Sequence, residues 1–158
     1  MITTVSIFEI YQIINAEHKD PHTILGMHEV LFDGKEMLSV RIFAPCAKSV
    51  TVIDKKDKRR KYHSQKLHDD GFFESVIKNR NKWFNYILKI EYIDGNTTEI
   101  EDMYSFRPLI SEYDRYLFNA GNHYEIYNKL GAHMCNVDGV DGVSFAVWAP
   151  NAKSVSII

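Results

Sequence analysis

Five acidic residues in two groups are the first candidates for chemistry in this chain: Asp69 with Asp70, and Glu99 with Glu101 and Asp102. Two carboxyl groups can act as general acid and general base when their surroundings push their pKa values apart. Both groups lie beside predicted turns, and no nearby residues indicate such surroundings. We interpret them as surface turn residues and predict no catalytic residue, since the sequence also lacks a G-x-S-x-G motif and a glycine-rich phosphate loop.

Three histidines, His18, His22 and His28, are close enough in sequence to suggest a metal site. The Leu-Gly-x-His motif that contains His28 recurs at 130–133, where His133 has no companion histidines. A structural hydrogen bond from the ring explains both copies better than a metal does. We therefore predict neither a metal site nor a cofactor.

Trp83 is the best candidate for ligand binding. It lies in the polar, cationic stretch 79–85, just before a predicted strand, where its indole could be exposed. Flat aromatic rings stack on the C–H faces of sugars, and a few placed polar groups then bind the hydroxyls. We predict a carbohydrate-binding site at Trp83 with Lys82 and Tyr86. The alternative is that Trp83 closes the end of a β-sheet core.

The charge of the chain limits its partners. Its net charge of −2 gives no basis for binding nucleic acid or an anionic membrane surface, and no stretch is long enough to cross a membrane. Six of the seven residues from Lys55 to Lys61 are cations; we interpret this run as a solvated hairpin, with an anionic partner as the alternative. Two isolated thiols, Cys46 and Cys135, and a start without a signal-peptide pattern favour a cytoplasmic location.

The elements that must position these residues are mostly short strands. A capping box, Ser6-x-x-Glu9, predicts a helix that ends near Glu17, with Ile7, Ile10, Tyr11 and Ile14 on its apolar face. Alternation of apolar and polar residues predicts strands over 38–44, 49–53, 61–67, 72–77 and 84–93. Asp-Gly pairs at 33–34, 70–71, 94–95, 138–139 and 141–142 predict hairpin turns, because both residues tolerate positive φ.

The chain also repeats itself. Residues 25–53 align without a gap on residues 130–158, and thirteen of the 29 positions are identical. A fixed offset of 105 residues indicates a duplicated structural unit. The second copy reaches residue 158 inside its second predicted strand, so we expect the chain to be part of a longer protein. Between the copies, Ser111-x-x-Asp114 and Asn122-x-x-Glu125 predict two short helices whose apolar face carries several aromatic residues: Tyr113, Tyr116, Phe118, Tyr124 and Tyr127.

Three stretches of this sequence resemble the N-terminal region of bacterial 1,4-α-glucan (glycogen) branching enzymes. Residues 20–28 resemble the start of that family's first module, and residues 102–108 and 117–133, with Leu-Phe-x-x-Gly-x-His-Tyr, resemble its connector. Residues 137–152 resemble the opening of its second module, a family 48 carbohydrate-binding module. The sequence departs from the family at Met103, where proline is usual, and at Cys46, where glycine is common.

The resemblance implies a mainly β fold: an antiparallel immunoglobulin-like β-sandwich with a short N-terminal helix and a helical connector, plus the truncated start of a second sandwich. We place the N-terminal helix at 1–20, the first sandwich at 21–105, the connector at 106–130 and the second module at 131–158. The family's catalytic (β/α)-barrel, a retaining glycosyltransferase of the α-amylase superfamily, would lie outside this chain, which should itself be inactive.

The function implied is that of a non-catalytic module that binds or positions α-glucan, such as glycogen or a malto-oligosaccharide, and that packs on the barrel. The alternative is a purely structural spacer with no affinity for glucan. A regulatory module, like the glycogen-binding parts of kinase regulatory subunits, is disfavoured by the double module. We also expect residues 130–158 to cover an edge of the first sandwich or to pair with another chain through the strands at 143–158, because an unpaired apolar strand favours association.

Overall fold

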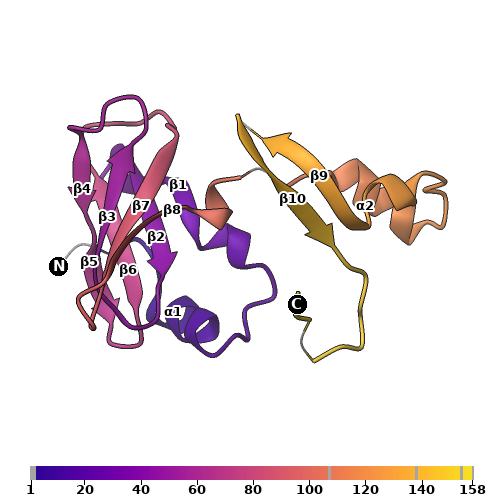
Figure 1. Cartoon of the computed structure of the whole chain (residues 1–158), viewed down its shortest axis with the longest axis horizontal. Helices are drawn as coiled ribbons and strands as arrows, with labels where there is room; N and C mark the ends of the chain where they lie inside the picture. The colour runs from indigo at the N-terminus through magenta and orange to yellow at the C-terminus, as the bar shows by residue number, and fades with distance from the viewer. Residues whose placement is uncertain (1–2, 107, 138, 154, 158) are drawn as a thin grey trace. The chain divides into compact units, whose positions relative to one another are not determined.

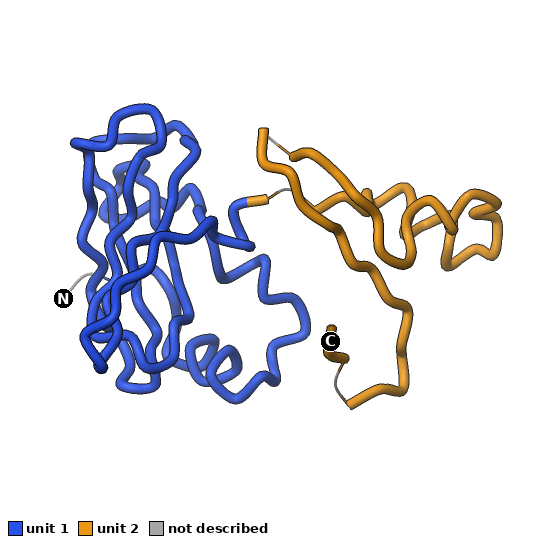
Figure 2. The backbone as a smooth tube through the Cα atoms, viewed as in Figure 1, with its two compact units in different colours: residues 1–105 blue, residues 106–158 orange. Residues whose placement is uncertain are grey.

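The computed structural model describes residues 3–106, 108–137, 139–153 and 155–157. The chain divides into two compact units, residues 1–105 and residues 106–158 (Figure 2). Each unit is described here by itself. Among the residues discussed above, Arg107, Asp138, Ser154 and Ile158 lie outside the described ranges.

Unit 1 is a sandwich of two antiparallel four-stranded sheets (Figure 1). One sheet has the strand order β1 (Gly26–Phe32), β2 (Lys35–Phe43), β6 (Phe72–Ile77), β5 (Gln65–His68). The other has the order β4 (Lys61–His63), β3 (Ala47–Asp54), β7 (Tyr86–Tyr92), β8 (Thr97–Glu101). Side chains from both sheets, including Val40, Phe73, Val52 and Leu88, form one buried core. The mainly β, antiparallel sandwich predicted from the strand pattern is confirmed.

Helix α1 (Ile7–Ile14) precedes the sandwich. Its predicted capping box is confirmed, because the Ser6 hydroxyl accepts from the backbone N–H of Glu9 while the Glu9 carboxylate accepts from the N–H of Ser6. The predicted end near Glu17 was wrong: the helix ends at Ile14, and Ala16 takes a φ of +56° that breaks the helical path. The predicted apolar face is confirmed in part: Ile10 is buried and Ile14 packs against the same cluster, whereas Ile7 and Tyr11 are exposed and Ile13 is buried in their place.

A second apolar cluster lies between α1 and the first sheet. It joins Ile10 and Ile13 to Leu25 and Phe72, with Ile24 and Val5 completing it. Beyond α1, a single 3-10 turn, η1 (Pro21–Thr23), leads into β1. Strand β2 is consequently covered on both sides, and the polar members of its alternating pattern, Ser39 and Arg41, are buried like their apolar neighbours.

The hairpin turns follow the Asp-Gly pairs in most cases. Asp33 and Gly34 both have positive φ, at 52° and 72°, and they join β1 to β2 as predicted. Gly71 and Gly95 also have positive φ at turns. The prediction for 141–142 was wrong, since Gly142 lies inside strand β10 opposite Cys135. The cationic run from Lys55 onwards connects β3 to β4 in an exposed hairpin, as predicted.

Unit 1 ends with the 3-10 turn η2 (Met103–Ser105), and unit 2 begins with the connector. Helix α2 (Glu112–Asn119) has the predicted capping box between Ser111 and Asp114. The second predicted helix was wrong in extent and in its cap: only a 3-10 turn forms, η3 (Ile126–Asn128), and the Glu125 side chain makes no capping hydrogen bond. The connector aromatics are mostly exposed, as at Tyr113, Tyr116, Tyr124 and Tyr127, so they form no packed face within the described part of unit 2.

The remainder of unit 2 is a two-stranded hairpin of β9 (Gly131–Val137) and β10 (Val140–Ala146). Its register repeats that of β1 and β2 residue by residue: Gly26 faces Arg41 as Gly131 faces Ala146, and His28 faces Ser39 as His133 faces Ser144. The second strand predicted for this copy is not formed at 155–157, where the aligned residues of unit 1 belong to β3. A single hairpin offers no second sheet for such a strand to join.

Candidate functional site

The loop between β6 and β7, residues 78–85, holds the predicted binding residues. Trp83 is 52% exposed, so it does not close the end of the core, and Lys82 beside it is exposed too. Phe84, which is 8% exposed, fills that place in the core instead. The inclusion of Tyr86 in the site needs correction: it is 2% exposed because strand alternation turns its ring toward the core.

Two contacts hold this loop against the end of strand β3, and a third holds it together internally. The Arg80 guanidinium donates to the Asp54 carboxylate at 2.6 Å and lies 4.0 Å from the centroid of the Phe84 ring. The backbone N–H of Lys55 donates to the carbonyl of Asn85 at 2.9 Å. Trp83 is therefore presented by a braced loop, and a ligand would not need to order it, which lowers the entropic cost of binding.

The pKa of Asp54 agrees with the geometry of its ion pair with Arg80. Burial alone would raise the pKa of Asp54, but the hydrogen bond from Arg80 and the backbone N–H groups of Lys56 and Asp57 hold that pKa below its ordinary value. Asp54 is thus a stable carboxylate that keeps Arg80 in place. An exposed indole on such a loop can stack on a flat ligand face, and Lys82 can donate to a polar group beside it.

Tyr86 has a structural partner in place of a ligand. Its hydroxyl donates to the Asp102 carboxylate at 2.5 Å, and the same carboxyl group accepts from the backbone N–H of Tyr104 at 2.9 Å. Burial raises the pKa of Asp102 above its ordinary value despite these bonds. The interpretation of Asp102 as a surface turn residue was therefore wrong: it ties the end of unit 1 to strand β7. Glu101 next to it pairs with Lys55 at 2.8 Å.

The histidines act as predicted for a structural role. The His28 ring pairs through Nε2 with the Leu25 carbonyl oxygen at 3.0 Å, and the His133 ring pairs in the same way with the Leu130 carbonyl oxygen at 2.8 Å. Burial lowers the pKa of His28 below its ordinary value. In the described ranges, no three His, Cys, Asp or Glu side chains gather as a metal site.

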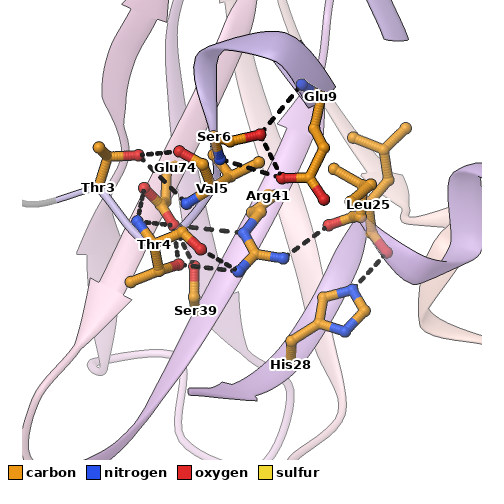
Figure 3. Close-up of polar contacts among 11 residues, drawn as sticks. Thr3, Thr4, Val5, Ser6, Glu9, Leu25, His28, Ser39, Arg41 and Glu74 are labelled. Atoms are coloured by element: carbon orange, nitrogen blue, oxygen red, sulfur yellow. Dashed lines mark hydrogen bonds and ion pairs between the residues drawn. The ribbon is translucent and has the colours of Figure 1, made fainter. Parts of the chain in front are cut away.

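A buried polar network is the feature that the sequence did not predict (Figure 3). The Arg41 guanidinium lies 3.4 Å from the Glu74 carboxylate, which also accepts from the Ser39 hydroxyl at 2.6 Å and from the Thr4 hydroxyl. The guanidinium donates as well to the carbonyl oxygens of Thr4, at 3.0 Å, and Ile24, at 3.2 Å. Two features of the sequence could have indicated this network: Glu74 interrupts an apolar strand pattern, and Arg41 occupies the polar face of β2.

The network anchors the N-terminal segment and does not form a ligand site. Burial would raise the pKa of Glu74, but its hydrogen bonds from Ser39 and Thr4 lower that pKa below the ordinary value. Glu74 is therefore a buried carboxylate whose charge and hydrogen bonds are satisfied within unit 1. Its partners come from strand β2 and from the N-terminal segment, so the network fixes that segment to the first sheet.

The two packed sheets define a β-sandwich module with an exposed tryptophan, and the comparisons with known proteins give its family. Residues 7–104 match the family described as alpha-1,4-glucan branching enzyme GlgB, N-terminal domain. Residues 129–158 match carbohydrate-binding module 48 (isoamylase N-terminal domain). The chain belongs to the GlgB N-terminal domain family, which confirms the resemblance found in the sequence.

Curated relatives agree with this assignment. The 1,4-alpha-glucan branching enzyme GlgB of Trichodesmium erythraeum is 46% identical over 98% of this chain, and that of Thermosynechococcus vestitus is 44% identical over 98%. The GlgB of Pseudomonas syringae pv. syringae is 43% identical over 92% of this chain. This chain spans about a fifth of the length of these relatives, covering 20%, 20% and 19% of them.

A solved structure also matches part of the chain. It is the catalytic module of the multi-modular glycogen-degrading pneumococcal virulence factor SpuA, which covers 60% of this chain and 14% of its own at 18% identity. Its TM-score of 0.36 is too low to support a statement about this fold. Separately, no helix in the described ranges has the length and apolar run needed to cross a membrane.

Proposed function

We propose that this chain is the non-catalytic N-terminal part of a 1,4-α-glucan branching enzyme, and that unit 1 binds α-glucan through Trp83 and Lys82. Family membership and the names of the relatives support the first statement. One observation carries the second: the Trp83 indole is 52% exposed on a loop held by Arg80 and Asn85. An indole held in this way presents a flat apolar face on which a sugar ring can stack.

The branching reaction itself belongs to the parent enzyme. It cleaves an α-1,4 chain and transfers the released segment to a 6-hydroxyl, which makes an α-1,6 branch. We assign this chemistry to a catalytic barrel in the four-fifths of the relatives' length that this chain does not span. The division into an N-terminal helix at 1–20, a sandwich at 21–105, a connector at 106–130 and a second module from 131 onwards is part of the same proposal.

The spacer function is the competing candidate. It is favoured by the burial of Phe84 and Tyr86, which leaves Trp83 without a second exposed aromatic in its own loop. A glucan would then have one stacking contact there, and a single contact gives weak binding. The two functions differ in one measurable property, the affinity of unit 1 for neutral α-glucan.

Native gel electrophoresis in the presence of glycogen tests this property. We expect glycogen to retard the 158-residue chain, Trp83→Ala to abolish the retardation, and Trp83→Phe to keep part of it, because a smaller ring still stacks. Phe8→Ala is the matched control, since Phe8 is an exposed aromatic, at 66%, on helix α1. Migration that glycogen leaves unchanged in the parent chain would contradict glucan binding and favour the spacer.

Exposed apolar residues in unit 2 indicate a further partner for this chain. Val143, Phe145, Val147 and Trp148 are about half exposed or more, at 48%, 49%, 64% and 48%. We propose that residues 143–158 pair with a second copy of this chain in isolation, and that the first module packs on the barrel in the parent. Sedimentation velocity at increasing concentration tests the self-association: a dimer supports it, and a monomer at all concentrations contradicts it. The two free thiols, Cys46 and Cys135, are consistent with a cytoplasmic location, which we also propose.

A further inference from the structure

The cationic turn between β3 and β4 lies at the same end of the sandwich as Trp83. Asp54 at the end of β3 faces Tyr86 at the start of β7, and Ile53 faces Lys61 at the start of β4. The two loops that leave these strand ends, 55–60 and 78–85, therefore emerge side by side (Figure 1). The hydrogen bond between the Lys55 N–H and the Asn85 carbonyl joins them directly.

These two loops concentrate the positive charge of the chain. They and the first residue of β4 hold nine of its 19 Lys and Arg residues, although the chain as a whole has a net charge of −2. The nine are Lys55, Lys56, Lys58, Arg59, Arg60, Lys61, Lys78, Arg80 and Lys82. Such a cluster repels itself in the free protein and attracts an anion at this end of the molecule.

The local acidic residues neutralise only part of this charge. Asp57 is shared by Arg59, at 3.2 Å, and Arg60, at 3.4 Å. Asp54 pairs with Arg80 and Glu101 pairs with Lys55. Among the described residues, the ion pairs include none at Lys56, Lys58 or Lys61, and the Arg59 side chain is 94% exposed. Positive charge is thus presented to solvent beside an exposed indole.

We propose that this end of unit 1 binds an anionic α-glucan, one that carries phosphate monoesters, with a sugar ring on Trp83 and a phosphate at the Lys58–Arg59 turn. The inference rests on the proposed glucan binding at Trp83 and adds the substrate class. Neutral glucan uses the indole and leaves the cations unpaired, whereas a phosphorylated chain satisfies both. Guanidinium groups suit this ligand because they pair with phosphate through two parallel N–H···O bonds.

Affinity electrophoresis with two matched polymers tests the proposal. One is amylopectin that bears phosphate monoesters, and the other is the same preparation after phosphatase treatment. We expect the 158-residue chain to bind the phosphorylated polymer about five- to tenfold more tightly at low ionic strength, as two exposed ion pairs would give. This difference in affinity should disappear in about 0.5 M salt, because exposed charges more than a few ångströms apart are then screened from one another.

Two double variants locate the effect. Lys58→Ser with Arg59→Ser should remove the preference and leave the binding of the neutral polymer unchanged. Lys19→Ser with Lys35→Ser is the matched control, because it removes the same charge from exposed positions outside these loops and should keep the preference. Trp83→Ala should weaken the binding of both polymers.

The outcomes separate this inference from the proposed function. Equal binding of the two polymers would overturn the inference and leave glucan binding in place. Binding of neither would overturn both. An affinity for the phosphorylated polymer that Trp83→Ala leaves unchanged would show simple ion exchange and overturn the inference. Displacement by single-stranded oligodeoxythymidylate at lower concentration than by the phosphorylated polymer would also overturn it, since that strand stacks on aromatic rings as well.

Discussion

The hairpins β1–β2 and β9–β10 have the same register and the same histidine-to-carbonyl hydrogen bond, yet their side chains meet different surroundings. In unit 1, Met27 and Val40 are 1% and 0% exposed because strands of both sheets cover them. In unit 2, Phe145, which aligns with Val40, is 49% exposed. Trp148, which aligns with the half-buried Phe43, meets Phe118 with ring centroids 5.7 Å apart and stays 48% exposed. Local sequence is thus enough for the hairpin, whereas burial depends on the strands that pack on it.

The largest expected difference between the two copies concerns the polar network. The residue aligned with Arg41 is Ala146, so only the first hairpin carries a buried ion pair. We expect Glu74→Ala to lower the free energy of unfolding of unit 1 by about 3–5 kcal/mol, because the charge of Arg41 would remain buried without a carboxylate to balance it. Urea denaturation followed by far-ultraviolet circular dichroism measures this loss.

A double variant sharpens the test of the network. Arg41→Met with Glu74→Leu removes both charges and should recover most of the stability lost in Glu74→Ala, because apolar replacement of a buried pair is often nearly neutral. A loss below about 1 kcal/mol for Glu74→Ala alone would contradict the anchoring role.

The second largest expected difference in stability between the two copies is the effect of alanine at the glycines of the Leu-Gly-x-His motif, Gly26 and Gly131. A Cβ on Gly26, whose φ is +89°, would lie 2.5 Å from the Tyr104 carbonyl oxygen, so strain and overlap should cost about 2–4 kcal/mol. Gly131 has a φ of +99° and its nearest neighbour is the His133 ring nitrogen at 3.9 Å, so strain alone should cost about 1 kcal/mol. Amide hydrogen exchange in each hairpin measures the loss of stability that each substitution causes. Equal losses would show that Tyr104 does not constrain the first copy.

Cys46 offers a gain in stability. Its φ of +63° is the left-handed conformation that glycine takes without strain, and glycine is common there in the family that the sequence resembles. We expect Cys46→Gly to stabilise unit 1 by about 0.5–1 kcal/mol, seen as a higher midpoint in urea. Cys46→Ala is the control, because it removes the thiol and keeps the strain; an equal gain from both variants would assign the effect to the thiol.

The smallest expected effect is a pH dependence at His28. Burial lowers the pKa of His28 in the folded state, so the unfolded state binds the proton more readily. Stability is therefore fully present above the ordinary pKa of 6.5 and is lost as the pH falls from there through the lowered value. His28→Asn should flatten this part of the profile of unfolding free energy against pH, with His133→Asn as the matched control; a profile that keeps its slope in His28→Asn would exclude His28 as the cause.

The candidate site shows which features could be predicted from the sequence and which could not. The polar composition of 79–85 left open whether Trp83 is exposed or closes the core, and the structure shows that Trp83 and Lys82 are both exposed. Alternate residues of a strand point to one side, and Tyr86 shares a face of the following strand with Leu88 and Ile90. The burial of Tyr86 could therefore have been predicted from this alternation. The brace from Arg80 to Asp54 was not predictable, because it joins residues 26 positions apart whose proximity depends on strand pairing.

The sequence by itself determined the local elements: both capping boxes, the Asp-Gly turn of the first hairpin, the alternating strands and the duplicated hairpin with its histidine. Their causes lie within a few residues along the chain, so the capping box, the hairpin register and the histidine-to-carbonyl pair recur in both copies. Tertiary structure alone decided that Arg41 and Glu74 are buried, that Phe84 fills the end of the core, and that the cationic run after Lys55 lies beside the loop 78–85. Burial, pairing and charge concentration depend on segments that are distant in sequence, and these come together only when the two sheets and the N-terminal segment pack on one another.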